Sequence, residues 1–305
     1  MNNIELLKTR ARIVKTIREF FDERGFTEVE TAVRIPAPAP EEHIDCPECG
    51  GEYLRASPEL QMKKLLADGF ERIYQIGPCF REGEKGSRHN PEFTMLEWYR
   101  IDATYMDIAE DLKGLLAAVW GGFSRDSRGG LGQTALPTDQ RGGLGQTALP
   151  RMVTITVRDA YRRFAGWDPW TEWDQDRFDY DMAVKIEPAI KEMGGWVFLI
   201  DYPREAASLA RVREGSLAER WEFYFDGMEL ANCFTELTDS REQLSRFARA
   251  KENRKALGEA DYPLDYGFID CLNRINAASG VALGVDRLVM ILTNSKIIRD
   301  IRAEI

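Results

Sequence analysis

The chain has 305 residues, enough for one large domain or two ordinary ones, and 44% of them are hydrophobic, as in globular proteins. Asp and Glu number 51 against 41 Lys and Arg. The net charge of −10 argues against a protein that coats nucleic acid or an anionic membrane, because both need a positive field. The sequence has no apolar run of the roughly 20 residues that span a bilayer, and no secretory-signal pattern. Five scattered cysteines favour a cytoplasmic protein over a disulfide scaffold.

The first hundred residues alternate between helical and extended patterns. Apolar spacing predicts a helix over 4–24 and a strand over 29–35, which the proline run 36–40 ends as a stiff linker. Ser57-Pro58-Glu59 favours a helix start, because it offers a capping hydroxyl, a first-turn proline and an acid near the positive helix end. That helix is predicted to run to about Asp68. Strands are predicted at 72–80 and 92–100, on either side of a polar loop.

Residues 121–150 break this pattern. Thr104 and Asp107 resemble a capping box, which predicts a helix ending near Trp120. The run Arg-Gly-Gly-Leu-Gly-Gln-Thr-Ala-Leu-Pro then occurs twice, at 128–137 and 141–150. Two short glycine-rich copies do not make a solenoid, whose longer units bury a shared face. We expect a mobile insertion at 121–150 without a catalytic role.

The second half of the chain favours hairpins. It predicts strands at 152–157 and 196–200, with a helix around 174–192 between them. Two further strands, 220–225 and 228–236, flank Asp226-Gly227, a strong two-residue turn. A polar helix follows to near Gly258, and 280–292 predicts a strand that leads into a helix. Because no regular βαβ rhythm appears, we predict an α+β fold, a mainly antiparallel sheet flanked by helices, as one domain over 1–305.

The strand at 92–100 carries the first candidate for chemistry. Alternation puts Phe93, Glu97 and Tyr99 on one face with Met95, where a ring, a carboxylate and a phenol could form a platform and an amine-reading pocket. Arg81 ends the facing strand, and its guanidinium could hold a carboxylate or a phosphate. The alternative is an ordinary hairpin with a solvated, charged tip.

The hairpin around Asp226-Gly227 carries the second candidate. Tyr224 is expected opposite Glu229, with Glu222 as its diagonal neighbour on the same face. Two carboxylates that close repel each other unless they share a proton or a divalent cation, and such oxygen ligands suit Mg²⁺ held jointly with phosphates. The alternative is a solvent-facing acidic hairpin.

Two weaker candidates remain. Gly284 allows close backbone approach, and Arg287 lies in the first turn of a helix, where its charge opposes the dipole unless an anion compensates it. The alternative is a core strand with a surface arginine. His43, Cys46 and Cys49 are spaced like zinc ligands, but no second Cys/His pair follows, so a loop with two free thiols is the competing interpretation.

Taken together, these segments resemble the catalytic domain of class II aminoacyl-tRNA synthetases of the lysyl type. The family's second motif is matched from Arg81 to Met95, including the run Arg-His-Asn-Pro-Glu-Phe-Thr-Met. Its third motif is matched by Ala282-Leu-Gly-Val-Asp-Arg287, with alanine at the first glycine. The run 229–239 also matches, except that Cys233 replaces a glycine. Ala32 stands where the first motif usually has a proline that shapes the dimer interface.

The helix before the first motif begins at residue 4, where a lysyl synthetase would have an anticodon-binding domain. The chain therefore resembles the free-standing bacterial paralogues that act on elongation factor P, and no anticodon-binding domain is expected. The resemblance implies an ATP- and Mg²⁺-dependent ligase that adenylates lysine or, preferentially, (R)-β-lysine and transfers it to a lysine of elongation factor P. It also implies a homodimer, and tRNA is not expected as acceptor. Ala282 supports this branch, since an extra methyl in a tight pocket can alter the substrate backbone accepted.

The resemblance also implies roles for individual residues. Arg81 would bridge the α-phosphate and the substrate carboxylate, and Arg287 would hold the γ-phosphate; these are the two catalytic residues. Glu222 and Glu229 would bind Mg²⁺. The further ATP-binding positions would be Glu82, Gly83, His89, Asn90, Phe93, Glu229, Leu230 and Gly284. The substrate positions would be Ser57, Pro58, Glu59, Glu97, Tyr99, Asn232, Glu236 and Ala282.

One conflict in this assignment makes a structural prediction. In a regular strand Glu229 faces one side and Asn232 and Glu236 face the other. All three reach one site only if the strand is irregular, so we predict a bulge near Leu230 to Asn232.

Two other functions are compatible with the motifs: a truncated lysyl synthetase that charges tRNA, and a catalytically silent amino-acid sensor. Retention of Arg81, Glu229 and Arg287 speaks against the sensor, which needs no phosphate ligands.

Overall fold

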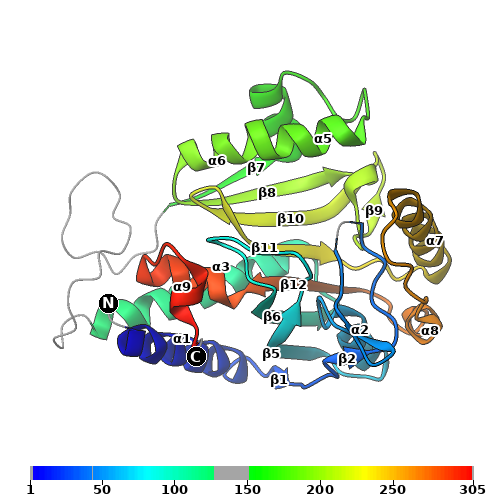
Figure 1. Ribbon diagram of the computed structural model, residues 1–305. Coiled ribbons are helices and arrows are strands. Elements are labelled where there is room, and N and C mark those ends of the chain that lie inside the picture. Colours follow the sequence, from blue (N-terminus) through cyan, green and yellow to red (C-terminus); the bar gives the residue numbers. More distant parts are fainter. Residues whose placement is uncertain (1–2, 43, 127–150, 304–305) are drawn as a thin grey trace.

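A computed structural model describes residues 3–42, 44–126 and 151–303 of the chain. Figure 1 shows a central twisted sheet with helices on both faces. The two glycine-rich copies lie outside the described residues, as does His43. The insertion predicted over 121–150 is therefore described only for 121–126, which belong to a helix rather than to an insertion.

The sheet contains nine strands in the order β1-β5-β6-β12-β11-β10-β8-β7, with β9 paired to β10. Only the two outermost pairs, β1 with β5 and β7 with β8, are parallel, so the predicted α+β fold with a mainly antiparallel sheet is confirmed. The strands are β1 (Thr27–Glu28), β5 (Arg72–Phe80), β6 (Glu92–Ile101), β7 (Met152–Thr156), β8 (Trp196–Pro203), β9 (Val212–Arg213), β10 (Leu217–Phe225), β11 (Met228–Thr235) and β12 (Ala278–Gly284). A small second sheet holds β2 (Arg34–Ile35), β3 (Glu48–Cys49) and β4 (Glu52–Leu54).

One face of the large sheet is closed by the main hydrophobic core. Helices α1 (Asn3–Asp22), α3 (Tyr105–Asp126) and α9 (Val285–Thr293) lie against it, with the short 3₁₀ turn η4 (Ile298–Ile301) (Figure 1). Apolar residues from both layers are buried there, including Trp98, Trp221 and Leu283. Burial of this continuous apolar face fixes which side of each central strand is left for polar side chains.

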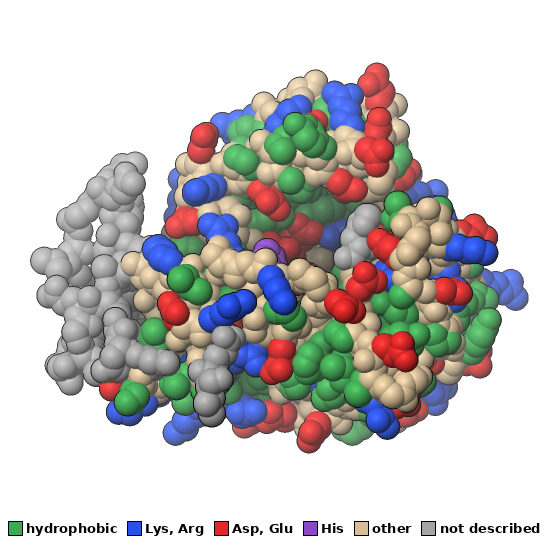
Figure 2. All heavy atoms as spheres, viewed as in Figure 1, with side chains coloured by type: hydrophobic (Ala, Val, Ile, Leu, Met, Phe, Trp, Pro, Cys, Tyr) green, Lys and Arg blue, Asp and Glu red, His purple; other side chains and the backbone are tan. Residues whose placement is uncertain are grey.

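In the described part of the chain, the other face is covered at its two ends. Helix α4 (Val157–Ala160), the π turn η1 (Tyr161–Ala165) and the helical run α5 (Gln175–Asp181), η2 (Met182–Ile186) and α6 (Glu187–Met193) cover the β8–β7 end. Helices α2 (Glu59–Ala67), α7 (Ser240–Leu257) and α8 (Tyr266–Leu272) cover the opposite end. Figure 2 shows the hollow between the two groups, with acidic side chains gathered inside it.

Several sequence predictions differ from the structure in detail. The strand predicted over 29–35 is wrong: of that range, Arg34–Ile35 (β2) alone is a strand, and β1 ends before it. The buried guanidinium of Arg55 takes the carbonyls of Thr31 (2.9 Å) and Ala32 (3.2 Å), which a continuous strand would use for pairing. Helix α3 continues to Asp126, past the predicted end near Trp120. The helix predicted around 174–192 contains the π turn η2, and α4, η1 and α8 were not predicted.

The predicted helix ends and turns are confirmed where they have specific chemistry. Thr104 and Asp107 form the capping box, with the Asp107 carboxylate accepting from the Thr104 amide at 2.7 Å. Asp239 caps α7, and Gly258 ends it in the left-handed region. Asp226 and Gly227 both have positive φ, as the two-residue turn requires. Among the described residues, no helix is both long and apolar enough to cross a bilayer.

Candidate active site

The predicted irregularity in β11 is present at Leu230. Phe223 pairs with Ala231 and Tyr224 pairs with Glu229, so β11 has one extra residue there. Leu230 and Ala231 both point into the main core, which puts Glu229 and Asn232 on the opposite, open face. Asn232 pairs with Glu222, so that face now carries both ends of the expected site. The prediction is confirmed, and because the Leu230 side chain lies in the core, only its backbone can meet a ligand.

One end of this face holds an acid–lysine cluster, formed by Glu59, Lys63, Glu97, Tyr99 and Glu236. Lys63 of α2 is 1% exposed, and its Nζ lies 2.5 Å from Glu59 Oε1 and 2.5 Å from Glu236 Oε2. Burial works against the ammonium charge, but Glu236 and Glu59 outweigh it and raise the pKa of Lys63. Burial also raises the pKa of Glu236. We treat the pair as ionic, because a neutral Glu236 would leave Lys63 with a single carboxylate.

Glu97 lies at the floor of the same cluster and is fully buried. Ser57 Oγ donates to one of its carboxylate oxygens (2.6 Å) and Tyr99 Oη donates to the other (2.8 Å). Burial and the negative charge of Glu59 raise the pKa of Glu97 to about 7, against the lowering effect of the two hydrogen bonds. The predicted substrate residues Ser57, Glu59, Glu97 and Tyr99 are thus held together by strand β6 and the start of α2.

The cluster depends on two small residues of β12. Ala282 pairs with Glu97 on one side and Asn232 on the other, so its methyl lies between two predicted substrate residues. Gly280 lies opposite Tyr99, and a Cβ added to it would meet the tyrosine ring at 2.1 Å and Glu236 Oε1 at 2.9 Å. Only glycine allows the Tyr99 ring to lie across the strand. Pro58 is buried at the start of α2.

The other end of the face holds an arginine–acid cluster, formed by Arg81, Arg220, Glu222, Glu229 and Arg287. Arg287 Nη1 donates to the backbone carbonyl of Glu229 (2.7 Å), and its Nη2 lies 2.7 Å from His89 Nε2. Burial and the charge of Arg287 lower the pKa of His89, which favours the neutral ring. Gly284 precedes α9, and the buried Asp286 anchors that helix through Arg10 and the backbone of Thr94. The first turn of α9 is therefore fixed with the Arg287 side chain pointing towards the β10–β11 hairpin.

Glu222 and Glu229 are diagonal neighbours on the open face of β10 and β11, because Glu222 pairs with Asn232 and Glu229 pairs with Tyr224. Burial and the charge of Glu222 raise the pKa of Glu229, while Arg287, Arg220 and Arg81 lower it. Glu222 accepts from Arg220 Nη2 and from Tyr224 Oη, each at 2.5 Å. Two hard oxygen donors in a partly dehydrated site fit Mg²⁺. No group of three or more His, Cys, Asp or Glu side chains suited to a metal ion is found within the described ranges, so phosphate oxygens would have to complete this coordination.

The β5–β6 hairpin positions the remaining predicted ATP residues. The Arg81 guanidinium carbon lies 5.2 Å from the centre of the Phe93 ring, which places the cation and the aromatic face side by side. The Glu82 amide donates to the carbonyl of Asp45 (2.8 Å), and Gly83 adopts φ +78° at the hairpin tip. Asn90 Nδ2 donates to the carbonyl of Glu92 (2.8 Å), so its amide group spans the end of the loop.

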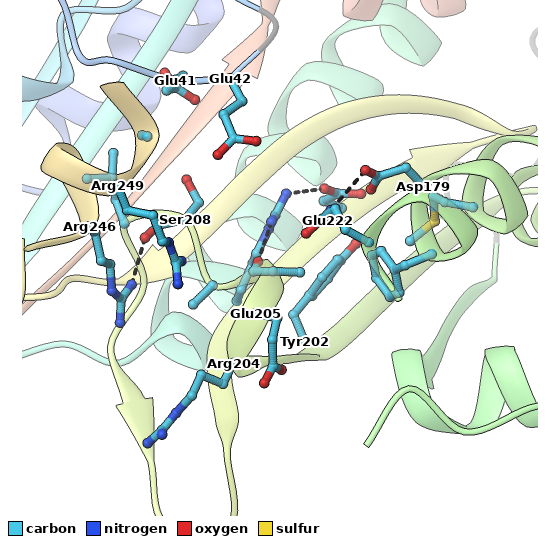
Figure 3. Close-up of a pocket in the computed structure, with 18 of the residues that line it drawn as sticks. Glu41, Glu42, Asp179, Tyr202, Arg204, Glu205, Ser208, Glu222, Arg246 and Arg249 are labelled. Carbon is cyan, nitrogen blue, oxygen red and sulfur yellow. Dashed lines mark hydrogen bonds and ion pairs between the residues drawn. The ribbon is translucent and has the colours of Figure 1, made fainter. Parts of the chain in front are cut away.

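A cavity of about 400 Å³ opens beside the arginine–acid cluster. Glu222, Glu229 and Arg220 are among the residues that line it. Glu41 and Glu42 lie at its edge (Figure 3). Tyr202 and Asp179 close the side towards β8 and α5, and Arg204, Arg246 and Arg249 lie on the far side (Figure 3). The cavity joins the acid pair to solvent, so a second reactant could approach from there.

Sequence reasoning missed three residues of the site. Lys63 follows Glu59 by four positions, a spacing that brings helical side chains together, and this signal could have identified it. Arg220 precedes Glu222 by two positions in one strand and so shares its face. Gly280 gave no signal, because its role depends on a ring from another strand. Cys46 is buried and Cys49 is exposed, as free thiols, so within the described residues the zinc interpretation gains no support.

Comparison with known proteins shows similarity along nearly the whole chain. The model of the family described as tRNA synthetases class II (D, K and N) matches residues 2–303. Three similar curated proteins are each named elongation factor P–(R)-beta-lysine ligase. The one from Vibrio cholerae is 34% identical, over 95% of this chain and 91% of its own length. The one from Proteus mirabilis is 36% identical (99% and 95%), and the one from Photorhabdus laumondii is 37% identical (98% and 94%). These matches confirm the fold class predicted from the sequence.

Proposed function

Because the chain belongs to the family of class II tRNA synthetases (D, K and N), we propose that it is an ATP-dependent ligase acting on a lysine-type amino acid. It activates that amino acid, preferentially (R)-β-lysine, as the aminoacyl-adenylate and transfers it to a lysine side chain of elongation factor P. The names of relatives at 34–37% identity support both the amino acid and the acceptor.

The observation that carries the proposal is the bulge at Leu230. It puts Glu229 and Asn232 on one face, and so joins the arginine–acid cluster to the acid–lysine cluster. Adenylation requires the carboxylate of the amino acid to reach the α-phosphorus in line with the leaving group, which demands one continuous site. A regular β11 would separate the two clusters onto opposite faces.

The acid–lysine cluster matches a lysine-type substrate in charge. It contains three carboxylates, Glu59, Glu97 and Glu236, and one ammonium, that of Lys63. When Glu97 is ionised, as a bound ammonium group favours, the excess of two negative charges corresponds to the two ammonium groups of lysine or β-lysine. Buried carboxylates of this kind strongly disfavour an analogue that lacks an amine, because they would be left without partners. Asn232 and Ala282, next to this cluster, would contact the substrate backbone.

The arginine–acid cluster supplies electrostatic stabilisation. Arg81 would hold the α-phosphate and the reacting carboxylate, and Arg287, supported by His89, would hold the γ-phosphate. Phe93 offers a face for the adenine ring, with Glu82, Gly83 and Asn90 around it. Mg²⁺ held by Glu222 and Glu229 would offset phosphate charge when bound. Preorganised charges of this kind, rather than a general base, suffice for attack by a carboxylate, which is already ionised.

A two-stage experiment tests the proposal. ATP–pyrophosphate exchange is measured with (R)-β-lysine and with α-lysine, and elongation factor P is then weighed by mass spectrometry after incubation with enzyme, ATP and each isomer. We expect exchange with both, faster with β-lysine, and a mass increase of one lysyl group on the factor. Absence of exchange with either isomer would contradict adenylation, and transfer to tRNA instead of the factor would select the tRNA-charging alternative.

We also propose that the protein is a homodimer. Light scattering would measure its molar mass in solution directly.

A further inference from the structure

Glu41 is a carboxylate at the edge of the cavity that none of the roles above employs. It lies in the segment after the proline run, and Arg254 of α7 holds that segment in place. The fully buried Arg254 donates through Nη1 to the carbonyls of Glu41 (2.7 Å) and Ile44 (3.1 Å), and through Nη2 to the Asp45 carboxylate (2.6 Å). The Asp45 carbonyl accepts from the Glu82 amide (2.8 Å). The segment is thus fixed against the hairpin that carries Arg81.

Charges from both ends of the site act on the Glu41 carboxyl. The charged groups around it are Glu59 and Lys63 of α2, Arg81 after β5 and Arg220 of β10. Burial and the charge of Glu59 raise its pKa above the ordinary value. Glu41 lines the same cavity as Arg220, Glu222 and Glu229. Its carboxyl therefore borders the part of the site where the phosphates and the reacting carbonyl would lie.

Glu41 is also free to accept a proton. The carboxylates of the acid–lysine cluster are all engaged: Glu59 and Glu236 pair with Lys63, and Glu97 accepts from Ser57 and Tyr99. Within the described part of the chain, the Glu41 side chain has no hydrogen bond or ion pair, and it borders the cavity through which a second reactant could enter (Figure 3).

We propose that Glu41 is the general base of the second half-reaction, the residue that removes a proton from the acceptor lysine as it attacks the adenylate. The inference rests on the proposed function. The acceptor arrives as an ammonium ion and has to lose two protons. Glu41 takes the first proton, which frees the nitrogen lone pair to form the bond to the carbonyl carbon. The C–O bond to the phosphate breaks, AMP leaves with the electron pair, and the second proton leaves with it. A carboxylate attacking ATP needs no such base, so Glu41 distinguishes the two half-reactions.

The test separates the two half-reactions in the variant Glu41→Gln. Enzyme carrying labelled lysyl-adenylate is mixed with elongation factor P in a single turnover, and ATP–pyrophosphate exchange is measured separately. We expect transfer to fall about 100-fold or more, the range of general base catalysis, and exchange to fall far less. Hydroxylamine, an amine already unprotonated at neutral pH, should consume the adenylate at similar rates in the wild type and the variant, because it needs no base.

Glu42→Gln is the matched control, because Glu42 borders the same cavity but its carboxylate accepts from Asn253 Nδ2 (2.6 Å). It should transfer at the wild-type rate. The proposal is overturned if Glu41→Gln transfers as fast as the wild type. It is also overturned if exchange and the hydroxylamine reaction fall as much as transfer, because that result indicates substrate binding or structural support. Absence of exchange in the wild type would instead contradict the proposed function itself.

Discussion

The two clusters of the site differ in how far their charges are already paired. In the acid–lysine cluster, Lys63 is 1% exposed and forms ion pairs with both Glu59 and Glu236, and Ser57 and Tyr99 hold Glu97. In the arginine–acid cluster, Arg220 pairs with Glu222 at 2.5 Å, but Arg287 contacts the backbone of Glu229 rather than its carboxylate. Each carboxylate of the first cluster is therefore held by a partner, whereas the Glu229 carboxylate of the second is left for a ligand to balance.

This difference matches what each end has to recognise. A small diamine is best selected by a rigid pocket whose polar groups are fixed before binding, since rigidity lowers the entropy cost of association. A triphosphate with its metal brings several charges of both signs, so a half-open cluster can be completed by the ligand itself. Substitutions in the first cluster should therefore act on stability and substrate affinity, and those in the second should act on the chemical step.

The largest effect is expected at Arg287, in the arginine–acid cluster. Arg287→Met removes a charge that would stabilise the transferring phosphates, and the rate of ATP–pyrophosphate exchange at saturating lysine should fall about 100- to 1000-fold. Stability should change little, because the side chain is only partly buried and its partners are a carbonyl and His89. Lys85→Met, an exposed change in the nearby loop, is the control and should exchange normally. A comparable loss in both variants would contradict a specific phosphate role.

The next effect should appear at Lys63, as a loss of folding stability. Lys63→Met leaves Glu59 and Glu236 buried without a cation, which should lower the free energy of unfolding by about 3–5 kcal/mol, measured by urea denaturation. Adding Glu236→Gln should recover part of that loss. Lys64→Met is the matched control, since Lys64 pairs with Asp265 at the surface and is 34% exposed, and it should cost at most about 1 kcal/mol. Equal losses of stability in Lys63→Met and Lys64→Met would show that burying Lys63 with Glu59 and Glu236 has no particular effect on stability.

The bulge at Leu230 shows what the sequence can predict. Alternation of side chains in a strand is strict, so the demand that Glu229 and Asn232 share a site conflicted with a regular β11, and the conflict located the extra residue. The hairpin turn at Asp226-Gly227, the capping box at Thr104 and the end of α7 were predictable for the same reason, because local backbone rules determine them.

Features that depend on contacts between distant segments were not predictable. The strand expected over 29–35 has suitable side chains, but Arg55 occupies its carbonyls from another part of the chain. Likewise, Arg254 of α7 fixes Glu41 across more than two hundred residues. Nothing local in either segment signals these partners, since an arginine can satisfy carbonyls wherever the fold brings it.

A third test concerns the shape of the acid–lysine cluster at Gly280. Gly280→Ala places a methyl 2.1 Å from the Tyr99 ring, so the ring has to move away from Glu97. We expect a loss of about 1–3 kcal/mol in stability and a higher KM for the lysine substrate, with a smaller change in kcat. Gly86→Ala, at a loop glycine with open space around it, is the control and should change stability by less than about 0.5 kcal/mol. An unchanged KM in Gly280→Ala would show that the ring position does not shape the pocket.

The smallest effect is a pH dependence that comes from Glu97. Its pKa is raised from 4.5 to about 7 in the folded protein, chiefly by burial and then by Glu59, so between these two values the folded state binds more protons than the unfolded state. Stability without substrate should therefore fall as the pH rises through this range, with a slope of at most one proton from this group. The substrate ammonium prefers the ionised form, so its KM should fall over the same interval. Glu97→Gln should reduce the stability slope by the Glu97 contribution, leaving the contributions of Glu229 and Glu236, whose pKa values are also raised, and should flatten the KM trend. If the slope of stability against pH were the same in Glu97→Gln as in the wild type, the buried carboxyl could not be the titrating group.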